Sequence, residues 1–158
     1  MAGRYIVAGP PCSGKSTYVR QQALRGDLIY DYDALHSALS GLDSHDHDDG
    51  IRPYVLAVRD RVLELAASDL ERGLWVITST HKTAELARLQ AALSAKVVIM
   101  DVGRDEAHSR CDADSRPAEW HEYIDRWFDE TDIDAAEWTR KTVRAPRRTE
   151  VHAGILRA

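Results

Sequence analysis

The residues best suited to chemistry lie near the N-terminus, in the sequence GPPCSGKST at positions 9–17. Two glycines, a lysine and a serine at this spacing form the G-x-x-x-x-G-K-[ST] pattern of a phosphate-binding loop. Glycine lets the backbone wrap closely around an anion, and successive N–H groups can then point at its oxygens. The pattern predicts binding of a nucleoside triphosphate, ATP or another NTP. The candidate contacts are Gly9, Pro10, Pro11, Cys12, Ser13, Gly14, Lys15, Ser16 and Thr17.

Three side chains of this loop have distinct expected roles. Lys15 is expected to reach the β- and γ-phosphates, Ser16 to bind Mg²⁺, and Thr17 to lie beside the α-phosphate. A helix is predicted to begin at Lys15, and its N-terminus adds a partial positive charge. The loop therefore predicts ATP and Mg²⁺ as cofactors.

A second candidate group is Asp31-Tyr32-Asp33, at the end of a short apolar strand over 27–31. Ligands of open α/β sheets gather beyond the C-terminal ends of the strands, so both aspartates are expected near the terminal phosphate. A carboxylate there can accept the proton of an attacking hydroxyl, which makes Asp33 the candidate catalytic base. Alternatively Asp33 caps a helix that begins at Ala34, and the two roles are compatible. Asp31, His36 and Thr80 are candidate acceptor contacts.

Arginines mark a third candidate group, between residues 104 and 130. A helix over 105–112 is broken near 113–117, and Pro117 suits the first turn of a second helix that reaches Phe128. Two helices that meet at an arginine-bearing corner predict a lid over about 104–130, closing over the phosphates. Arg116 is the candidate for stabilising the transferred charge, and Arg110 for contacting the nucleotide. Surface ion pairs with neighbouring acidic residues are the alternative for both.

The segment 40–51 is crowded with His45, Asp46, His47, Asp48 and Asp49. Histidine and carboxylate are both metal ligands, but their spacing here matches no standard metal signature. A solvated loop that ends in a helix cap is the favoured interpretation. Because it follows the Asp33 helix, it is expected to border the acceptor site.

Thr80 follows another strand and is expected either to contact phosphate or to cap the next helix.

The remaining pattern places these groups on an α/β frame. Apolar runs predict strands over 5–8, 27–31, 74–78 and 96–101, with helices over 15–23, 51–71 and 84–93 between them. The longest helix repeats apolar residues at helical spacing and is expected to be scaffold. The fold predicted is a single three-layer α/β domain over 1–158, with a short parallel sheet in the order 2-3-1-4 and a helical lid. Asp101 ends the fourth strand, but its position alone does not make it a metal ligand.

Composition narrows the class of partner. The 158 residues carry a formal net charge of −5, so no global basic field attracts nucleic acid. A local basic segment over about 138–158 either lines a nucleic-acid or nucleotide groove or is simply solvated. Two isolated cysteines and the lack of a membrane-length apolar run predict a cytoplasmic protein with no membrane partner. The basic residues of that segment cluster around Pro146, namely Arg140, Lys141, Arg144, Arg147 and Arg148.

Taken together, the loop at 9–17, Asp33 and the two lid arginines resemble the P-loop kinase group. That group includes phage-type polynucleotide 5′-hydroxyl kinases, zeta-toxin-like kinases and related small phosphotransferases. The resemblance spans about residues 5–128. It implies that Asp33 is the general base, and that Arg116, or else Arg110, is the lid arginine that stabilises the transferring phosphate.

Two positions depart from the polynucleotide kinase pattern. His36 stands where an arginine that binds the acceptor phosphate is expected, and an imidazole binds phosphate more weakly than a bidentate guanidinium. Ser79 stands where the group often has an aspartate at the end of the third strand.

The functional hypothesis is an ATP- and Mg²⁺-dependent phosphotransferase that moves the γ-phosphoryl to a hydroxyl acceptor. A polynucleotide 5′-hydroxyl kinase-like activity comes first, with a nucleic-acid end or a nucleotide as the acceptor. One alternative is a kinase of a nucleotide or other small metabolite. The other is an ATPase or nucleotide switch that acts through a protein partner. The sequence does not predict the oligomeric state.

Overall fold

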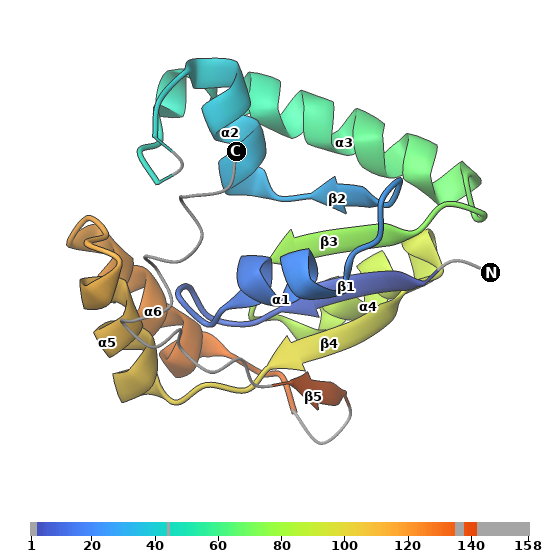
Figure 1. Cartoon of the computed structure of the whole chain (residues 1–158). Coiled ribbons are helices and arrows are strands. Elements are labelled where there is room, and N and C mark those ends of the chain that lie inside the picture. The colour runs from blue at the N-terminus through green and yellow to red at the C-terminus, as the bar shows by residue number, and fades with distance from the viewer. Residues whose placement is uncertain (1–2, 44, 135–137, 142–158) are drawn as a thin grey trace, which may run out of the picture.

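The computed structural model describes residues 3–43, 45–134 and 138–141 (Figure 1). Strands and helices alternate along the chain, as the sequence pattern predicts. The strands are β1 (Arg4–Ala8), β2 (Leu28–Tyr30), β3 (Leu74–Thr78), β4 (Lys96–Met100) and β5 (Thr139–Lys141). The helices are α1 (Lys15–Gln22), α2 (Tyr32–Ser40), the short 3-10 helix η1 (Asp49–Ile51), α3 (Arg52–Ser68), α4 (Thr83–Leu93), α5 (Arg104–Ala113) and α6 (Glu119–Glu130).

The strands form one parallel sheet in the order β2-β3-β1-β4-β5. The predicted order 2-3-1-4 is therefore confirmed for the first four strands. The fifth strand was not predicted, because Thr139, Arg140 and Lys141 are polar and carry no apolar pattern. An edge strand tolerates such residues, since its outer side faces solvent, and all three are exposed. The other basic residues of this segment, Arg144, Arg147 and Arg148, lie outside the described residues.

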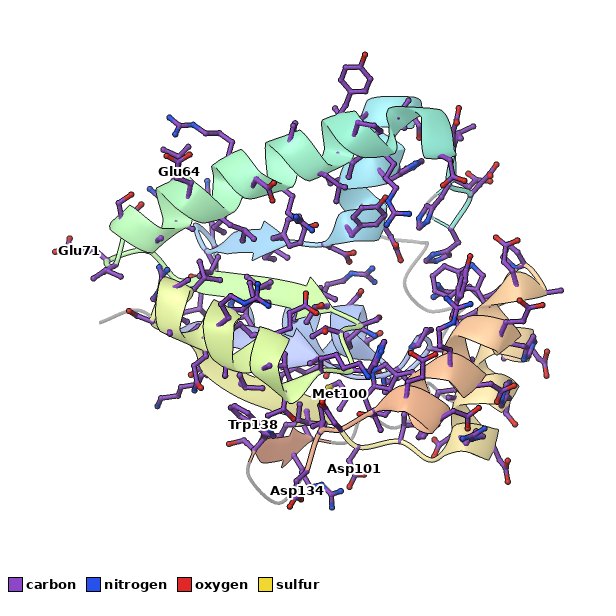
Figure 2. The ribbon with its side chains drawn as sticks, turned by 180° about the vertical axis from the view of Figure 1, so that it is seen from behind. Glu64, Glu71, Met100, Asp101, Asp134 and Trp138 are labelled. Carbon is purple, nitrogen blue, oxygen red and sulfur yellow. The ribbon has the colours of Figure 1, made fainter. Side chains whose placement is uncertain are left out.

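Helices cover both faces of the sheet, which confirms the predicted three layers (Figures 1 and 2). Successive strand residues point to opposite faces. Ile6 and Ala8 belong to one core cluster with Leu86 of α4, and Val7 belongs to a second cluster with Val19 of α1. All five residues are essentially inaccessible to solvent. Burial on both faces explains why the central strands are continuously apolar.

Helix α3 buries less than its periodic pattern predicts. Val55 and Ala66 are buried, whereas Val58 and Leu65 are 37% and 53% exposed and Leu70 lies beyond the helix end. The prediction fails here because α3 packs on α2 and α4 at the margin of the sheet, so only a narrow stripe is covered. The helix still serves as scaffold.

A buried arginine at the start of β1 connects the C-terminal ends of two helices. The Arg4 guanidinium donates to the carbonyls of Ala66 (2.8 Å), Asp69 (2.8 Å) and Leu93 (2.9 Å). These carbonyls lie at the C-terminal ends of α3 and α4, where a cation offsets the negative end of the helix dipole. Arg4 therefore fixes the two helices to the start of β1.

The C-terminal ends of the strands point toward the α5–α6 pair (Figure 1). These two helices pack on each other through Ala107, Cys111, Trp120 and Ile124, and Cys12 packs against this small cluster. The two helices predicted over 105–112 and from Pro117 are thus observed, beside the loop at 9–17. None of the helices in the described part of the chain has both the length and the apolar character needed to cross a membrane.

Candidate active site

The loop between β1 and α1 has a backbone that requires glycine. Gly9 has φ +155°, and a Cβ there would lie 3.0 Å from both Met100 Cβ and Ser13 Oγ. Gly14 adopts a left-handed conformation with φ 89° directly before α1. Because only glycine adopts these conformations without strain or collision, the sequence allows the chain to turn tightly between β1 and α1.

The loop also contains a buried hydroxyl that needs a partner. Ser13 is 2% exposed, and its Oγ is one of the few buried polar atoms in the described residues without a hydrogen bond. Leaving such a hydroxyl unsatisfied costs free energy. A phosphate oxygen in the loop would satisfy it, so the cradle fits the nucleotide phosphates that the sequence predicts.

Lys15 is buried at the first position of α1. Its Nζ donates to the carbonyls of Gly9 (2.9 Å) and Pro10 (2.6 Å). Burial lowers the pKa of Lys15 to about 8, and the nearby Asp33 carboxylate opposes this shift. The ammonium is thus a poorly hydrated cation at the loop, where a phosphate would stabilise its charged form. Thr17 is half-buried in the first turn of the same helix.

Ser16 pairs with the strand-end aspartate Asp31. The Ser16 hydroxyl donates to Asp31 Oδ2 at 3.0 Å, and Asp31 Oδ1 accepts from the Asp33 N–H at 3.1 Å. Asp31 is therefore the N-cap of α2, which begins at Tyr32, so the prediction that Asp33 caps a helix starting at Ala34 is wrong. A hydroxyl and a carboxylate are oxygen ligands of the kind that Mg²⁺ takes, so this pair fits the predicted metal.

Asp33 lies in the first turn of α2, and its carboxylate does not cap the helix. Burial raises the pKa of the Asp33 carboxyl, and the neighbouring Asp31 raises it further. His47 Nε2 lies 3.2 Å from Asp33 Oδ1, and His45 Nδ1 lies 3.5 Å from Oδ2. These two histidines and the Lys15 ammonium act in the opposite direction and lower the pKa of Asp33.

The histidines of the 40–51 loop are not simply solvated, contrary to the favoured interpretation of that segment. His45 and His47 are only about one-third exposed and both contact Asp33. Across the described residues, no three His, Cys, Asp or Glu side chains are arranged to hold a metal ion. The loop instead borders the candidate base. Sequence reasoning missed both contacts, and the alternation of His and Asp was the available signal.

His36 lies inside the protein and binds the backbone of this loop. It is 0% exposed, so the side chain does not face an acceptor as the sequence prediction supposed. The Asp48 N–H donates to His36 Nε2 at 3.1 Å, and Ser40 Oγ lies 3.5 Å from Nδ1. The ring of His47 lies 4.6 Å from that of His36. His36 therefore fixes the loop rather than the substrate.

Arg116 faces the same site from the corner between α5 and α6. Its Nη1 donates to His45 Nδ1 at 2.8 Å, and its guanidinium lies 4.6 Å from the centre of the Trp120 ring. Burial lowers the pKa of His45, and the Arg116 charge lowers it further, which agrees with a neutral imidazole that accepts this bond. Nη2 also reaches Asp114 at 3.3 Å, so the predicted ion pair is present as well. Nε is buried without a hydrogen-bond partner.

Arg110 contacts the phosphate loop itself. Its Nη1 donates to the Ser13 carbonyl at 3.2 Å, and its Nη2 to Glu106 at 2.5 Å. Arg110 therefore links α5 to the loop backbone. Arg110 also makes the kind of ion pair that the alternative predicted, here with Glu106, and its contact with the nucleotide stays a prediction.

Thr80 lies in the segment between β3 and α4. Its hydroxyl bonds to Glu85 on the exposed side of α4. The N-terminus of α4 is instead bonded by Asp132, whose Oδ1 accepts from the Thr83 N–H at 2.6 Å. The prediction that Thr80 caps this helix is thus wrong.

Asp101 is exposed at the end of β4 beside β5, and its N–H donates to the Lys141 carbonyl at 2.7 Å (Figure 2).

Comparison with known proteins finds similar folds among solved structures. The sequence matches no protein-family model and none of the curated proteins. A gluconokinase from Sinorhizobium meliloti 1021 shares the fold with a TM-score of 0.60 at 18% identity, over 91% of this chain and 84% of its own. Shikimate kinase from Acinetobacter baumannii, solved with shikimate, has a TM-score of 0.56 at 16% identity, over 93% and 86%. A chain of the Pnkp1/Rnl/Hen1 RNA repair complex has a TM-score of 0.68 at 14% identity, over 94% of this chain and 50% of its own.

Proposed function

We propose that this chain, whose fold is that of P-loop kinases, transfers the γ-phosphoryl group of ATP to a hydroxyl acceptor with Mg²⁺. One observation carries the proposal. The Ser16 hydroxyl, one residue after Lys15, donates to Asp31 at 3.0 Å, and His45 Nδ1 lies 3.5 Å from Asp33 Oδ2 and 2.8 Å from Arg116 Nη1, so that the phosphate loop, α2 and the corner between α5 and α6 meet at one site. A cation for the donor, a carboxylate for the acceptor proton and a second cation for the developing charge are the parts that phosphoryl transfer requires.

Each of these residues has a role that follows from its position. The loop N–H groups and Lys15 hold the phosphates, and Ser16 with Asp31 would hold Mg²⁺. When bound, Mg²⁺ supplies positive charge that neutralises the phosphate oxygens. Asp33 accepts the proton of the acceptor hydroxyl, and its carboxylate must be ionised to do so. Arg116 stabilises the charge on the transferring group, and its unsatisfied Nε is available for a further hydrogen bond.

A polynucleotide 5′-hydroxyl is the first candidate acceptor. The chain from the RNA repair complex has the highest TM-score of the three structures compared, which favours a nucleic-acid end. A small hydroxylated metabolite is the second candidate. The residue at position 36 favours this candidate. A buried histidine stands there, in place of the arginine that would bind the acceptor phosphate of a polynucleotide.

A transfer assay with γ-labelled ATP tests the proposal. The acceptors are 5′-hydroxyl DNA and RNA oligonucleotides, nucleosides, gluconate and shikimate, each with wild type and with Asp33→Asn. Labelled product with at least one hydroxyl acceptor, lost in Asp33→Asn, supports the proposal. ATP hydrolysis of equal rate with and without every acceptor would instead favour an ATPase or a nucleotide switch. Labelled gluconate or shikimate without labelled oligonucleotide would select the second candidate.

A further inference from the structure

His45 lies between the candidate base and the candidate lid arginine. Its Nδ1 accepts a hydrogen bond from Arg116 Nη1 at 2.8 Å, and the same nitrogen lies 3.5 Å from Asp33 Oδ2. A nitrogen that accepts this bond carries no proton, so it does not donate to Asp33. The imidazole therefore lies against Oδ2 without a hydrogen bond from Nδ1 to that oxygen.

The space that His45 fills is the space that the reacting groups need. An acceptor hydroxyl must come within about 3 Å of the Asp33 carboxylate to give up its proton. Its oxygen must at the same time face the phosphoryl group, on which Arg116 is proposed to act. The hydroxyl thus belongs between Asp33 and Arg116, where the His45 ring now lies. His45 and a bound acceptor are therefore expected to exclude each other.

The Arg116 side chain depends on His45 for its main polar contact among the described residues. Its Nη2 lies 3.3 Å from Asp114, but that carboxylate is 58% exposed, and such ion pairs contribute little. The guanidinium also lies 4.6 Å from the centre of the Trp120 ring, whose face it covers. The same ring meets His45 at 5.1 Å, edge to face. Arg116 and His45 are thus held together at Trp120.

The backbone at Arg116 is fixed beside the phosphate loop. The Arg116 N–H donates to the Cys111 carbonyl at 3.2 Å, and Ser115 before it takes a left-handed conformation with φ 52°. Cys111 belongs to the buried cluster against which Cys12 of the loop packs. A rotation of the Arg116 side chain therefore suffices to free it from His45, and the freed guanidinium is next to the loop.

We propose that His45 is a positioning residue that holds Arg116 until an acceptor hydroxyl takes its place at Asp33, and so suppresses ATP hydrolysis. The inference rests on the proposed function. In hydrolysis a water oxygen bonds to the γ-phosphorus and its proton passes to Asp33, while the bond to the β–γ bridging oxygen breaks and its electron pair leaves on ADP. An acceptor hydroxyl follows the same steps. Water is too small to displace an imidazole held by Arg116 and Trp120, so only a bound acceptor frees the guanidinium for the phosphoryl charge.

Nucleotide binding by the full chain tests the proposal without an acceptor. With Mg²⁺, His45→Ala should bind a non-hydrolysable ATP analogue about tenfold more tightly than wild type and ADP equally, because only the γ-phosphate gains the freed Arg116. His45→Asn keeps an oxygen acceptor near the place of Nδ1 and should bind both as wild type does. Asp46→Ala, an exposed residue of the same loop, is the matched control. The gain should vanish when Arg116→Ala is added to His45→Ala.

An unchanged affinity of His45→Ala for the ATP analogue would overturn the proposal. An equal gain for ADP would also overturn it, because it would assign the effect to opening of the loop rather than to Arg116.

Kinetics separate this proposal from the proposed function. The ratio of ATP hydrolysis without acceptor to transfer with acceptor should rise about tenfold in His45→Ala and stay at the wild-type value in His45→Asn. A merely structural role of His45 would lower both rates together and leave the ratio unchanged. An unchanged ratio beside an active wild type would overturn the role of His45 alone. A wild type that phosphorylates no acceptor would remove the proposed function, and the role of His45 with it.

Discussion

Arg116 and His45 join the two sides of the site, with Nη1 of the arginine 2.8 Å from Nδ1 of the histidine. Arg116 belongs to the corner between α5 and α6, and His45 to the loop after α2. His45 also approaches Asp33, so its imidazole lies between the candidate base and the lid arginine. The reacting groups of a phosphoryl transfer must occupy the same region, because the base contacts the acceptor and the arginine contacts the phosphoryl. The loop after α2 and the corner between α5 and α6 are therefore expected to adjust together when substrates bind.

Replacing Lys15 tests the donor half of the site. Lys15→Met removes the cation at the loop while keeping the length of the side chain. Transfer should fall by about 10²–10³-fold, because a charge at the phosphates stabilises the transition state. The rate of labelled product formation measures this, and Arg20→Met on the exposed side of α1 is the matched control. Equal losses in both variants would assign the effect to α1 rather than to the site.

The pH dependence of stability tests the environment of Asp33. Burial raises its folded-state pKa above the ordinary aspartate value of 3.8, so the folded protein binds the Asp33 proton more tightly than the unfolded chain does. Its contribution to stability is complete below the unfolded pKa and is lost as the pH rises through the folded pKa. Asp33→Asn should therefore raise Tm at neutral pH and lose this advantage in acid. Thermal unfolding across pH measures the difference.

The activity of the same carboxylate should show the matching pH limb. The base must be ionised, so kcat should fall in acid around a pKa above 3.8. For the stability prediction, a Tm of Asp33→Asn that stays below the wild-type Tm at every pH would contradict the raised pKa of Asp33.

The frame of the fold was predictable because its signals are local. Continuous apolar strands such as Leu74–Thr78 and Lys96–Met100, separated by helical patterns, specify a parallel sheet with buried faces. The edge strand Thr139–Lys141 was missed because three polar residues become a strand only by pairing with β4. The exposed side of α3 was missed for a related reason, since periodicity gives a face but not how much of it a neighbour covers.

The site was predictable wherever the strand end sets the position. Gly9 and Asp33 follow this rule, because the topology alone brings them to one edge of the sheet. The difference between Asp31 and Asp33 was not predictable, since α2 begins two residues earlier than predicted and is capped by Asp31 rather than Asp33. The contacts of His45 and His47 depend on the bond between His36 and the backbone of Asp48, twelve residues apart, which no local pattern reports.

Arg4 should be among the most sensitive positions for stability. Arg4→Met removes four charge-assisted hydrogen bonds, three to carbonyls at the ends of α3 and α4 and one to the Arg72 carbonyl, with little change in side-chain volume. The free energy of unfolding should fall by about 3 kcal/mol, because the buried carbonyls lose their partner. Urea unfolding measures it, with the exposed Arg25→Met as the control. A loss no greater than that of Arg25→Met would show that water replaces the guanidinium at both helix ends.

Arg116 has two candidate roles, one on the transferring phosphoryl group and one in an ion pair with Asp114, and they predict different effects of mutation. If it acts on the transferring phosphoryl, Arg116→Lys should lower kcat about 10²-fold, because lysine keeps the charge but lacks the fork of donors. Asp114→Asn, which removes only the 3.3 Å ion pair, should then leave kcat unchanged. If the ion pair with Asp114 were its main role, Asp114→Asn would lose a small amount of stability and neither variant would lose kcat. Because exposed ion pairs contribute only about 0–1 kcal/mol, the kcat of Arg116→Lys is the decisive measurement.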